Sequence, residues 1–200
     1  MQHLAEQILT HAEGLPEGAP LAAKGLLHLG SRAGVDQALS RLANQGVIRR
    51  LTRGLYDYPR QSPRFGLLAP SADDIARAVA RKDNQVLQPS PAMAANQLGL
   101  STQVPSTPTY MTDGPTRTKK VGRQVIQFRK ASPKTLVGAG SKTGTVFQAL
   151  RYLGKDRMDD QVISKIARTL DAKDRALLAR QSKHVPAWMH PIVQQIVAHT

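Results

Sequence analysis

The sequence contains no cysteine, which excludes disulfide scaffolds, cysteine-ligated zinc ribbons, iron–sulfur sites and cysteine nucleophiles. Aromatic residues make up only 4% of the 200 residues, so Leu, Val, Ile and Ala must form most of the core. No apolar run approaches the roughly 18 residues of a membrane-spanning helix. The segment from Met1 to Glu6 lacks the basic start and apolar core of a signal peptide, so we expect a cytoplasmic protein without a membrane partner.

Acidic residues are scarce in comparison with basic ones. The chain has 14 Asp and Glu against 28 Lys and Arg, which gives a formal net charge of +14 at pH 7. This charge exceeds what the solubility of a small domain requires, and it indicates a polyanionic partner. Two dense basic clusters, residues 49–53 and 117–123, lie among Gly and β-branched residues, which predicts two basic hairpins. Each is either a phosphate-binding surface or a solvated charged turn.

Signatures of catalysis and of metal binding are also missing. None of the six histidines lies in a His-x-x-x-His or His-Glu-x-x-His pattern, and no serine lies in a Gly-x-Ser-x-Gly elbow. In the stretch 137–144, Ser stands before Lys142 where a phosphate-binding loop requires Gly, which favours a flexible link before a helix. The acidic pairs at 73–74 and 159–160 fit helix starts. We therefore expect no catalytic residue, no metal and no cofactor.

Three helices are predicted within the first 46 residues. Apolar residues recur at helical spacing over residues 3–13 and again over about 20–30. A third helix is predicted from Arg32 to Gln45, with Ser31 as its N-cap. The gap before this third helix is short, as a helix-turn-helix requires.

A short β-hairpin is predicted directly after the third helix. Residues 47–51 and 55–58 have strand character and are separated by a turn that contains Gly54. Three helices followed by a hairpin with a basic tip are typical of a winged helix-turn-helix. We therefore predict a DNA-binding domain over residues 1–60.

The outer face of the third helix carries small polar side chains and no Glu. Amide, hydroxyl and guanidinium groups read base edges in the major groove, and the arginines of the wing would contact the flanking backbone or minor groove. The alternative is the same fold used for protein contacts. The predicted DNA-contacting residues are Ser31, Arg32, Gln37, Ser40, Arg41, Asn44, Arg49, Arg50 and Arg53.

A second domain is predicted over residues 66–200, after a polar linker at residues 60–64. A short strand at 65–70 is expected to pack inward. The fold class is therefore α+β, with an N-terminal winged helix-turn-helix, an α+β domain with a small mixed sheet, and a helical C-terminal part. Strands are predicted at 85–88, 109–112, 116–121 and 124–130, and helices at 71–81, 92–98, 145–153, 160–170, 171–178 and 188–197.

Two parts of the chain resemble a known group of bacterial proteins. The stretches GSRAGVDQALSRL (30–42), IRR (48–50) and RGLYDYP (53–59) resemble the N-terminal winged helix of antitoxins of the abortive-infection E type. The toxin of those systems is a nucleotidyltransferase, and the pair is classed as a type IV toxin–antitoxin system. The runs NQLGLSTQVP (96–105) and YMTDGPTR (110–117) resemble uncharacterised bacterial proteins that are grouped with those antitoxins.

The resemblance covers most of residues 1–136 and implies a protein with two activities. The winged helix would repress its own operon by binding inverted repeats in the promoter, and the C-terminal part would counter the toxin. Carried over by position, the DNA contacts would be Arg32, Gln37, Arg41, Arg49 and Arg53. Composition and periodicity support the DNA-binding half, whereas the antitoxin half depends on the resemblance alone.

Two other functions remain open. A stand-alone winged-helix transcriptional regulator, whose C-terminal domain dimerises or senses a ligand, would have the same N-terminal features. An adjacent nucleotidyltransferase gene would favour the antitoxin. An RNA-binding or ribosome-associated factor is disfavoured by the low aromatic content, because single-stranded bases stack on aromatic rings. Further candidates for nucleic-acid or partner contact are Arg117, Lys119, Lys120 and Arg123.

Overall fold

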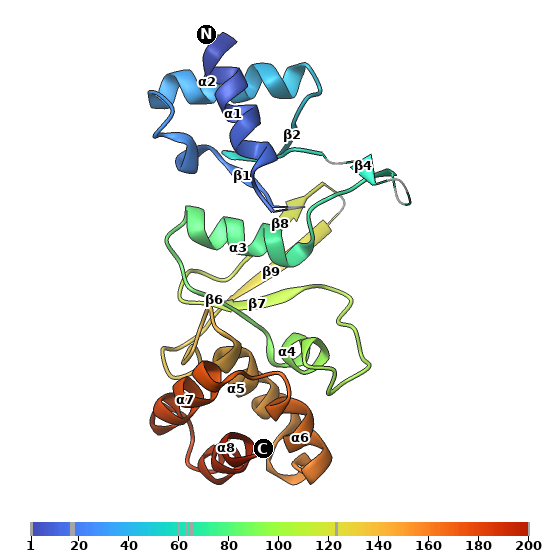
Figure 1. The fold of residues 1–200 in the computed structure, drawn as a ribbon, viewed down its shortest axis with the longest axis vertical. Helices are drawn as coiled ribbons and strands as arrows, with labels where there is room; N and C mark the ends of the chain where they lie inside the picture. The colour runs from blue at the N-terminus through green and yellow to red at the C-terminus, as the bar shows by residue number, and fades with distance from the viewer. Residues whose placement is uncertain are drawn as a thin grey trace. The chain divides into compact units, whose positions relative to one another are not determined.

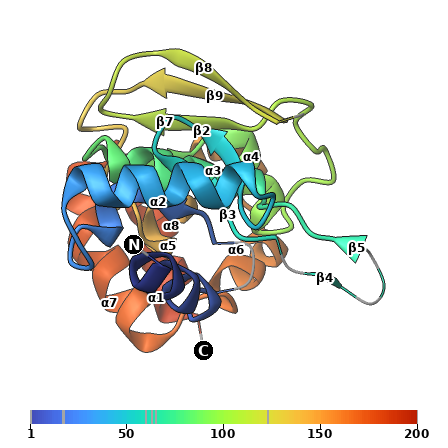
Figure 2. The same cartoon turned by 90° about the horizontal axis from the view of Figure 1, so that it is seen from above.

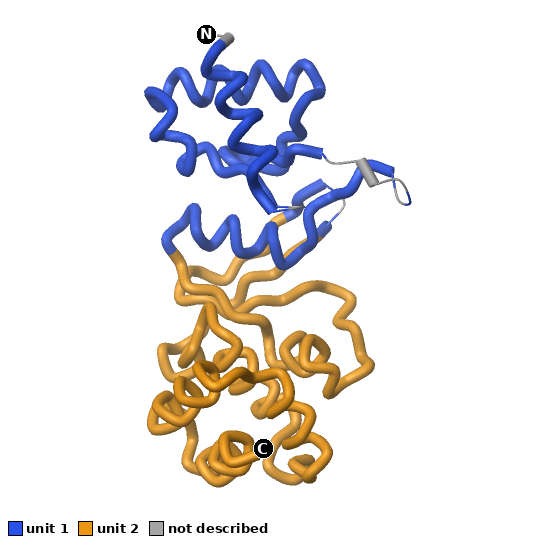
Figure 3. The backbone as a smooth tube through the Cα atoms, viewed as in Figure 1, with its two compact units in different colours: residues 1–84, 120–124 blue, residues 85–119, 125–200 orange. Residues whose placement is uncertain are grey.

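The chain forms an α+β structure, as predicted, with helices, a three-stranded antiparallel sheet and a four-stranded mixed sheet (Figure 1). It divides into two compact units (Figure 3). Unit 1 comprises residues 1–84 and 120–124, and unit 2 comprises residues 85–119 and 125–200. The computed structural model describes residues 2–16, 19–59, 61, 62, 64, 66–122 and 124–199.

Unit 1 consists of helices and short strands around one apolar core. Its largest buried side chains come from α1, η1, α2 and the β2–β3 hairpin. In chain order its elements are α1 (Gln2–Glu13), β1 (Leu21–Ala22), the 3-10 helix η1 (Ala23–Leu26), α2 (Arg32–Asn44), β2 (Arg49–Thr52), β3 (Leu55–Asp57), β4 (Gln61–Ser62), β5 (Gly66–Leu67) and α3 (Ala72–Lys82).

Helix α2 confirms the third predicted helix. The Ser31 hydroxyl oxygen accepts a hydrogen bond from the Gly34 N–H at 3.2 Å, which satisfies one of the free amides of the first turn. Val35 and Leu39 are fully buried against Ile8 of α1 and the rest of the same core. Burying such aliphatic side chains contributes about 1.5–3 kcal/mol each, so the apolar stripe fixes which face of α2 remains in solvent.

The predicted hairpin forms two strands of a three-stranded sheet, with β3 at its centre. Its strand order is β1-β3-β2, all antiparallel, with Tyr56 of β3 paired to Leu21 on one side and to Arg50 on the other. Gly54 has φ +71°, a left-handed conformation that glycine adopts without strain, and it closes the turn after Arg53. This order of helices and strands is compatible with a winged helix-turn-helix.

The helix predicted over residues 20–30 is wrong. Residues 21 and 22 instead pair with β3 as an edge strand, and only the single 3-10 turn η1 follows. The Ala23 N–H donates to the Gly54 carbonyl at 3.1 Å. This bond also ties the segment to the β2–β3 hairpin, residues 49–57, which we call the wing. A short apolar run fits either a strand or a buried helix. Here the run forms a strand, because the edge of β3 offers backbone hydrogen-bond partners to residues 21 and 22.

The segment between the wing and α3 also differs from the prediction. The polar linker contains β4, which pairs with β5, and Leu67 of β5 is 63% exposed, so the strand expected at 65–70 does not pack inward. Residues 60, 63 and 65 lie outside the described residues. Helix α3 belongs to unit 1, which continues to residue 84. The division into domains at 1–60 and 66–200 stays a prediction.

Unit 2 combines the mixed sheet with five α-helices among its described residues. The tip of its β8–β9 hairpin, residues 120–124, is grouped with unit 1. In chain order the elements are β6 (Leu87–Pro89), α4 (Pro91–Gln97), β7 (Thr109–Thr112), β8 (Arg117–Val121), β9 (Gln124–Lys130), α5 (Lys142–Leu153), η2 (Lys155–Arg157), α6 (Asp160–Ala167), α7 (Ala172–Gln181), η3 (Ser182–His184) and α8 (Met189–Ala198).

The sheet of unit 2 confirms the predicted small mixed sheet. Its order is β6-β7-β9-β8, and Figure 2 shows β7, β9 and β8 side by side. Strands β6 and β7 are antiparallel, whereas β7 and β9 are parallel, with Tyr110 opposite Phe128. Both rings are fully buried, and their centroids are 6.3 Å apart, so two of the few aromatic residues of the chain pack together in this sheet.

The C-terminal helices pack on one another within unit 2. Phe147 and Leu150 of α5, Ile166 of α6 and Met189 and Ile196 of α8 belong to one buried cluster. Small residues bring α4 close to α5 in the same unit. Within the described residues, no helix is both long enough and apolar enough to cross a membrane.

Candidate nucleic-acid interface

The solvent face of α2 presents a row of short polar side chains. Gln37, Ser40 and Asn44 are exposed at positions i, i+3 and i+7, which lie on one side of a helix. Arg41 is partly exposed next to this row. The opposite side is the buried stripe of α2, so the core holds the polar row outward. The structure therefore places these four predicted contacts on one surface.

The first turn of α2 is less available than the sequence predicts. The Ser31 hydroxyl is used for the helix cap. Arg32 Nε donates to Asp36 Oδ2 at 2.7 Å, and both side chains are at least about half exposed, at 60% and 49%. Sequence reasoning missed Asp36, because it considered only the lack of Glu on this face. A phosphate or base contact by Arg32 must compete with this carboxylate.

Arg49 forms an internal ion pair instead of pointing freely into solvent. Its Nε donates to Asp57 Oδ2 at 2.8 Å, and its Nη2 contacts the same oxygen and also donates to the Leu68 carbonyl at 2.5 Å. These bonds join β2, β3 and the segment after β5. The guanidinium of Arg49 thus holds the wing together, and we regard it as a positioning residue.

Asp57 is the partner that sequence reasoning missed. Its side chain is only 2% exposed, and burial raises the pKa of this carboxyl, an effect that the hydrogen bond and the charge of Arg49 partly oppose. The signal was present in the sequence. In a hairpin that turns at Gly54, residues 49 and 57 face each other across the two strands, as the register shows.

The two remaining arginines of the wing face solvent. Arg50 and Arg53 are exposed, and neither side chain forms an ion pair with the residues that the structure describes. The main chain of Arg53 is nevertheless fixed, because Lys82 Nζ at the end of α3 donates to its carbonyl at 2.6 Å. The wing therefore presents two cationic side chains on an anchored backbone.

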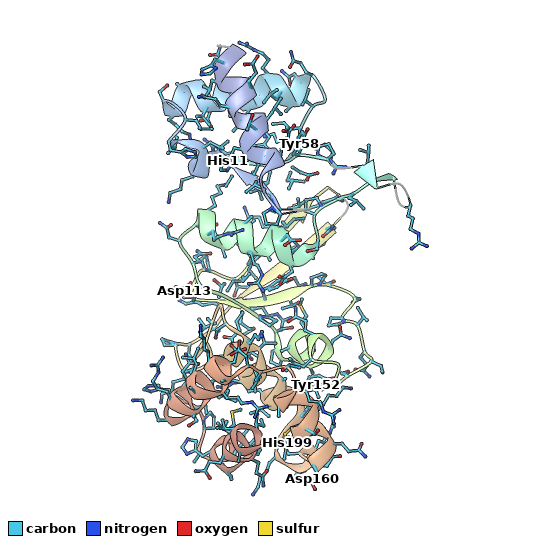
Figure 4. The ribbon with its side chains drawn as sticks, viewed as in Figure 1. His11, Tyr58, Asp113, Tyr152, Asp160 and His199 are labelled. Carbon is cyan, nitrogen blue, oxygen red and sulfur yellow. The ribbon has the colours of Figure 1, made fainter. Side chains whose placement is uncertain are left out.

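A hollow of about 400 Å³ joins the end of α2 to the wing. Its lining includes the predicted contacts Ser40, Asn44, Arg49 and Arg50, with Ile48 and Tyr56 beside them. The far side of the hairpin is also braced, since the hydroxyl of Tyr58, labelled in Figure 4, donates to Glu13 Oε1 of α1 at 3.3 Å. Tertiary structure thus brings Ser40 and Asn44 of the helix row and Arg50 of the wing around one hollow.

The second basic cluster is organised differently. Arg117 Nη2 donates to Gln85 Oε1 at 2.8 Å, and its guanidinium carbon lies 5.2 Å from the centre of the Phe128 ring. Lys119 is partly exposed and Lys120 is exposed. Arg123 lies outside the described residues. Among the described residues of this cluster, Arg117 is therefore engaged by contacts within unit 2, and Lys120 is the most exposed cation.

Side chains suited to hold a metal ion do not come together in the part of the chain that the structure describes. No group of three or more His, Asp or Glu residues forms there. Two histidines, His11 (labelled in Figure 4) and His28, contact each other with ring centroids 5.5 Å apart, and their planes are tilted. His28 is exposed, and no acidic residue among those described joins the pair to form a metal site.

Comparison with known proteins gives a family and no described function. A search of curated proteins found no match. A family model described as a family of unknown function (DUF6088) matches residues 7–178, which include α2, the wing, the mixed sheet and most of the C-terminal helices. The chain therefore belongs to this family of unknown function, DUF6088.

Proposed function

We propose that the protein binds duplex DNA through α2 and the wing and acts as a transcriptional repressor of its own operon. The observation that carries this proposal is the exposed polar row Gln37, Ser40 and Asn44 of α2. The last two of these residues share a hollow with the exposed Arg50, and the turn of the same hairpin exposes Arg53. Amide side chains form bidentate pairs with adenine in the major groove, and arginines neutralise phosphates. The net charge of +14 favours the same polyanion.

In the proposed mechanism, α2 and the wing make different kinds of contact with DNA. Helix α2 would enter the major groove and read bases through Gln37 and Asn44. Arg50 and Arg53 would contact the phosphates that flank the groove and supply affinity independent of sequence. Binding of inverted repeats requires two such surfaces, which a dimer or two adjacent monomers would provide.

The alternative use of this fold, contact with another protein, is less well supported by the exposed face of α2. Protein interfaces are enriched in aromatic residues, Met and Arg at their centre. The exposed residues of α2 and its cap among those described are Ser31, Arg32, Ala33, Asp36, Gln37, Ser40 and Asn44. None is a large apolar side chain, so this face offers hydrogen bonds and little area for a hydrophobic anchor.

The antitoxin role is proposed from the resemblance alone. It predicts that co-expression with a nucleotidyltransferase encoded next to this gene restores growth, and that a chain without residues 1–60 still does so. Failure of the full-length chain to restore growth would leave a stand-alone regulator as the better proposal.

Substitution of Gln37 by Ala tests base reading directly. Duplexes that bind the wild-type protein are first selected from a random library, and each position of the best site is then varied. The variant should lose about 1–3 kcal/mol of discrimination at one base position, without a change in the salt dependence of binding.

The matched control is Gln161→Ala, which removes an exposed glutamine from α6 of unit 2. This variant should select the same duplexes as the wild-type protein. Failure of the wild-type protein to shift any selected duplex, or an unchanged base preference in Gln37→Ala, would contradict the proposed interface.

A further inference from the structure

A hollow in unit 2 has a volume of about 730 Å³, within the range of small-molecule sites. It lies where the loop between β9 and α5 meets the end of α5 and the segment after α7. All of its described lining belongs to unit 2. The proposed DNA surface, which lies in unit 1, uses none of these residues.

The lining of this hollow is basic. Arg151, Lys134, Lys183 and His184 are among its residues, and no Asp or Glu is found in its described lining. None of these four side chains forms an ion pair with the residues that the structure describes. Several cations around a concave surface raise the positive electrostatic potential inside it. The hollow therefore attracts anions.

Arg151 is the cation of this lining whose charge is least compensated by the protein. Its Nη2 donates to the Lys134 carbonyl at 3.1 Å, but its Nε is fully buried and has no hydrogen-bond partner. Burial lowers the pKa of the Arg151 guanidinium, since desolvation penalises its charge and no carboxylate offsets the penalty. An anion bound in the hollow would supply the missing opposite charge.

Hydrogen bonds within unit 2 fix the segments that line the hollow, namely the loop before α5, α5 itself and the end of α7. Gln148, one turn before Arg151 on α5, is fully buried and donates through Nε2 to the Thr135 carbonyl at 2.9 Å. Thr143 Oγ1 donates to Gln181 Oε1 at 2.6 Å, which joins the start of α5 to the end of α7. The hollow is therefore built on fixed backbone, and a ligand would find its partners already positioned.

Apart from Thr135, the rest of the lining is apolar and suits a flat or aliphatic group. Pro133, Val137, Val185 and Pro186 lie around the same hollow. Guanidinium groups bind phosphate oxygens in bidentate geometry, which suits Arg151. We propose that this hollow binds a small molecule that carries a phosphate group and a compact apolar or heteroaromatic body, of about the size of a mononucleotide. This site goes beyond DNA binding and does not depend on it.

Isothermal titration calorimetry of the full-length protein tests this site with three probes: adenosine monophosphate, adenosine and inorganic phosphate. The monophosphate should bind, and adenosine should bind at least about ten-fold more weakly, because it lacks the charge that Arg151 requires. The Arg151→Gln variant should lose about ten-fold or more of the affinity for the monophosphate. Inorganic phosphate should compete with it.

The matched control is Arg168→Gln, which removes an exposed arginine of unit 2 that does not line the hollow. It should bind the monophosphate like the wild-type protein. If Arg151→Gln fails to fold, as judged by circular dichroism, the double variant Lys134→Gln/Lys183→Gln replaces it, since both lysines line the hollow with side chains that reach solvent.

Three results would overturn the proposal. These are no binding of the monophosphate at about 10 mM, equal affinity for adenosine, or unchanged affinity in the variants that fold. Binding of a short single-stranded oligonucleotide through Arg151, without binding of the monophosphate, would also overturn it and would assign this surface to nucleic acid. Operator binding should be the same in the wild-type protein and in Arg151→Gln, so failure here leaves the proposed function standing.

Discussion

The two basic hairpins look alike in the sequence and differ in the structure. In the β2–β3 hairpin, one arginine is held by a buried carboxylate, and Arg50 and Arg53 project into solvent. In the β8–β9 hairpin, Arg117 is held by an amide oxygen and an aromatic ring, and the exposed cations are Lys120 on β8 and Arg129 and Lys130 on β9 among the described residues. Charge density along the chain therefore does not say which cations are available to a partner.

The physical difference is the environment of the first arginine in each hairpin. Arg49 faces Asp57 across the strands, and Arg117 lies near the ring of Phe128 in unit 2. Each of these arginines is used to stabilise its own sheet. The cations nearest to this arginine differ in kind, because Arg50 and Arg53 carry planar guanidinium groups with bidentate geometry, whereas Lys119 and Lys120 of β8 carry compact ammonium groups.

The largest expected effect concerns DNA affinity. The double variant Arg50→Ala/Arg53→Ala should bind duplex DNA of any sequence roughly 50-fold more weakly at about 0.1 M salt, because two phosphate contacts contribute about 1.8 to the logarithmic salt slope. The slope should fall by about that amount. Fluorescence anisotropy over a range of salt concentrations measures both quantities.

The control for this prediction is the other hairpin. Lys119→Ala/Lys120→Ala removes the same number of charges from β8. The comparison between the hairpins fails if this control weakens DNA binding as much as the arginine variant does. An equal effect would show that net charge, and not the wing, determines affinity.

The second expected effect is on the stability of the wing. Arg49→Met leaves the buried Asp57 carboxylate without its partner, at a cost of roughly 1–3 kcal/mol of local stability at neutral pH. Since the pKa of Asp57 is already raised by burial, loss of Arg49 should raise it further. A protonated carboxyl carries no charge, so the deficit should shrink as the pH falls from about 7.5 to about 5.

Hydrogen exchange of the amides in β2 and β3 measures this local free energy of opening at both pH values. The double variant Arg49→Met/Asp57→Asn removes the titrating group and should lose the pH dependence. A deficit in Arg49→Met that is the same at both pH values would mean that the ion pair does not act as described.

The smallest expected effect is on unit 2. Arg117→Met should lower the stability of this unit by about 0.5–1 kcal/mol, because it removes the contact with the Phe128 ring. It should leave DNA affinity unchanged. Urea unfolding is followed by the fluorescence of Trp188, the one tryptophan of the chain, which packs in unit 2. Arg129→Met, at an exposed position of β9, should leave the stability of unit 2 unchanged. An equal loss of stability in both variants would show that the contact of Arg117 with the Phe128 ring is not stabilising.

Much of the fold was predictable because it depends on local periodicity. The buried stripe of α2, its Ser31 cap and the turn at Gly54 all follow from spacing and residue type. The helix expected at 20–30 was wrong because pairing of residues 21 and 22 with β3 is a long-range event. The exposed position of Leu67 was missed for a related reason, since its strand pairs only with β4 among the described residues.

The candidate DNA surface was predicted only in part. Residue types correctly marked the row on α2, but no local pattern showed that Arg32 is paired with Asp36 or that Arg49 is tied to Asp57 and the Leu68 carbonyl. The basic hollow of unit 2 was not predicted at all. Arg151 and Lys183 belong to different helical segments, and only the packing of α5 against α7 and η3 places them around one space.

By itself, the sequence determined the excess of positive charge, the absence of thiol chemistry and the faces of the long helices. These properties depend on composition and on a repeat of three to four residues. Only the tertiary structure decided which cations remain available, because a guanidinium is engaged by groups that lie far away along the chain or across a strand. Arg49 and Arg53 are four residues apart, yet one is an internal brace and the other an exposed charge.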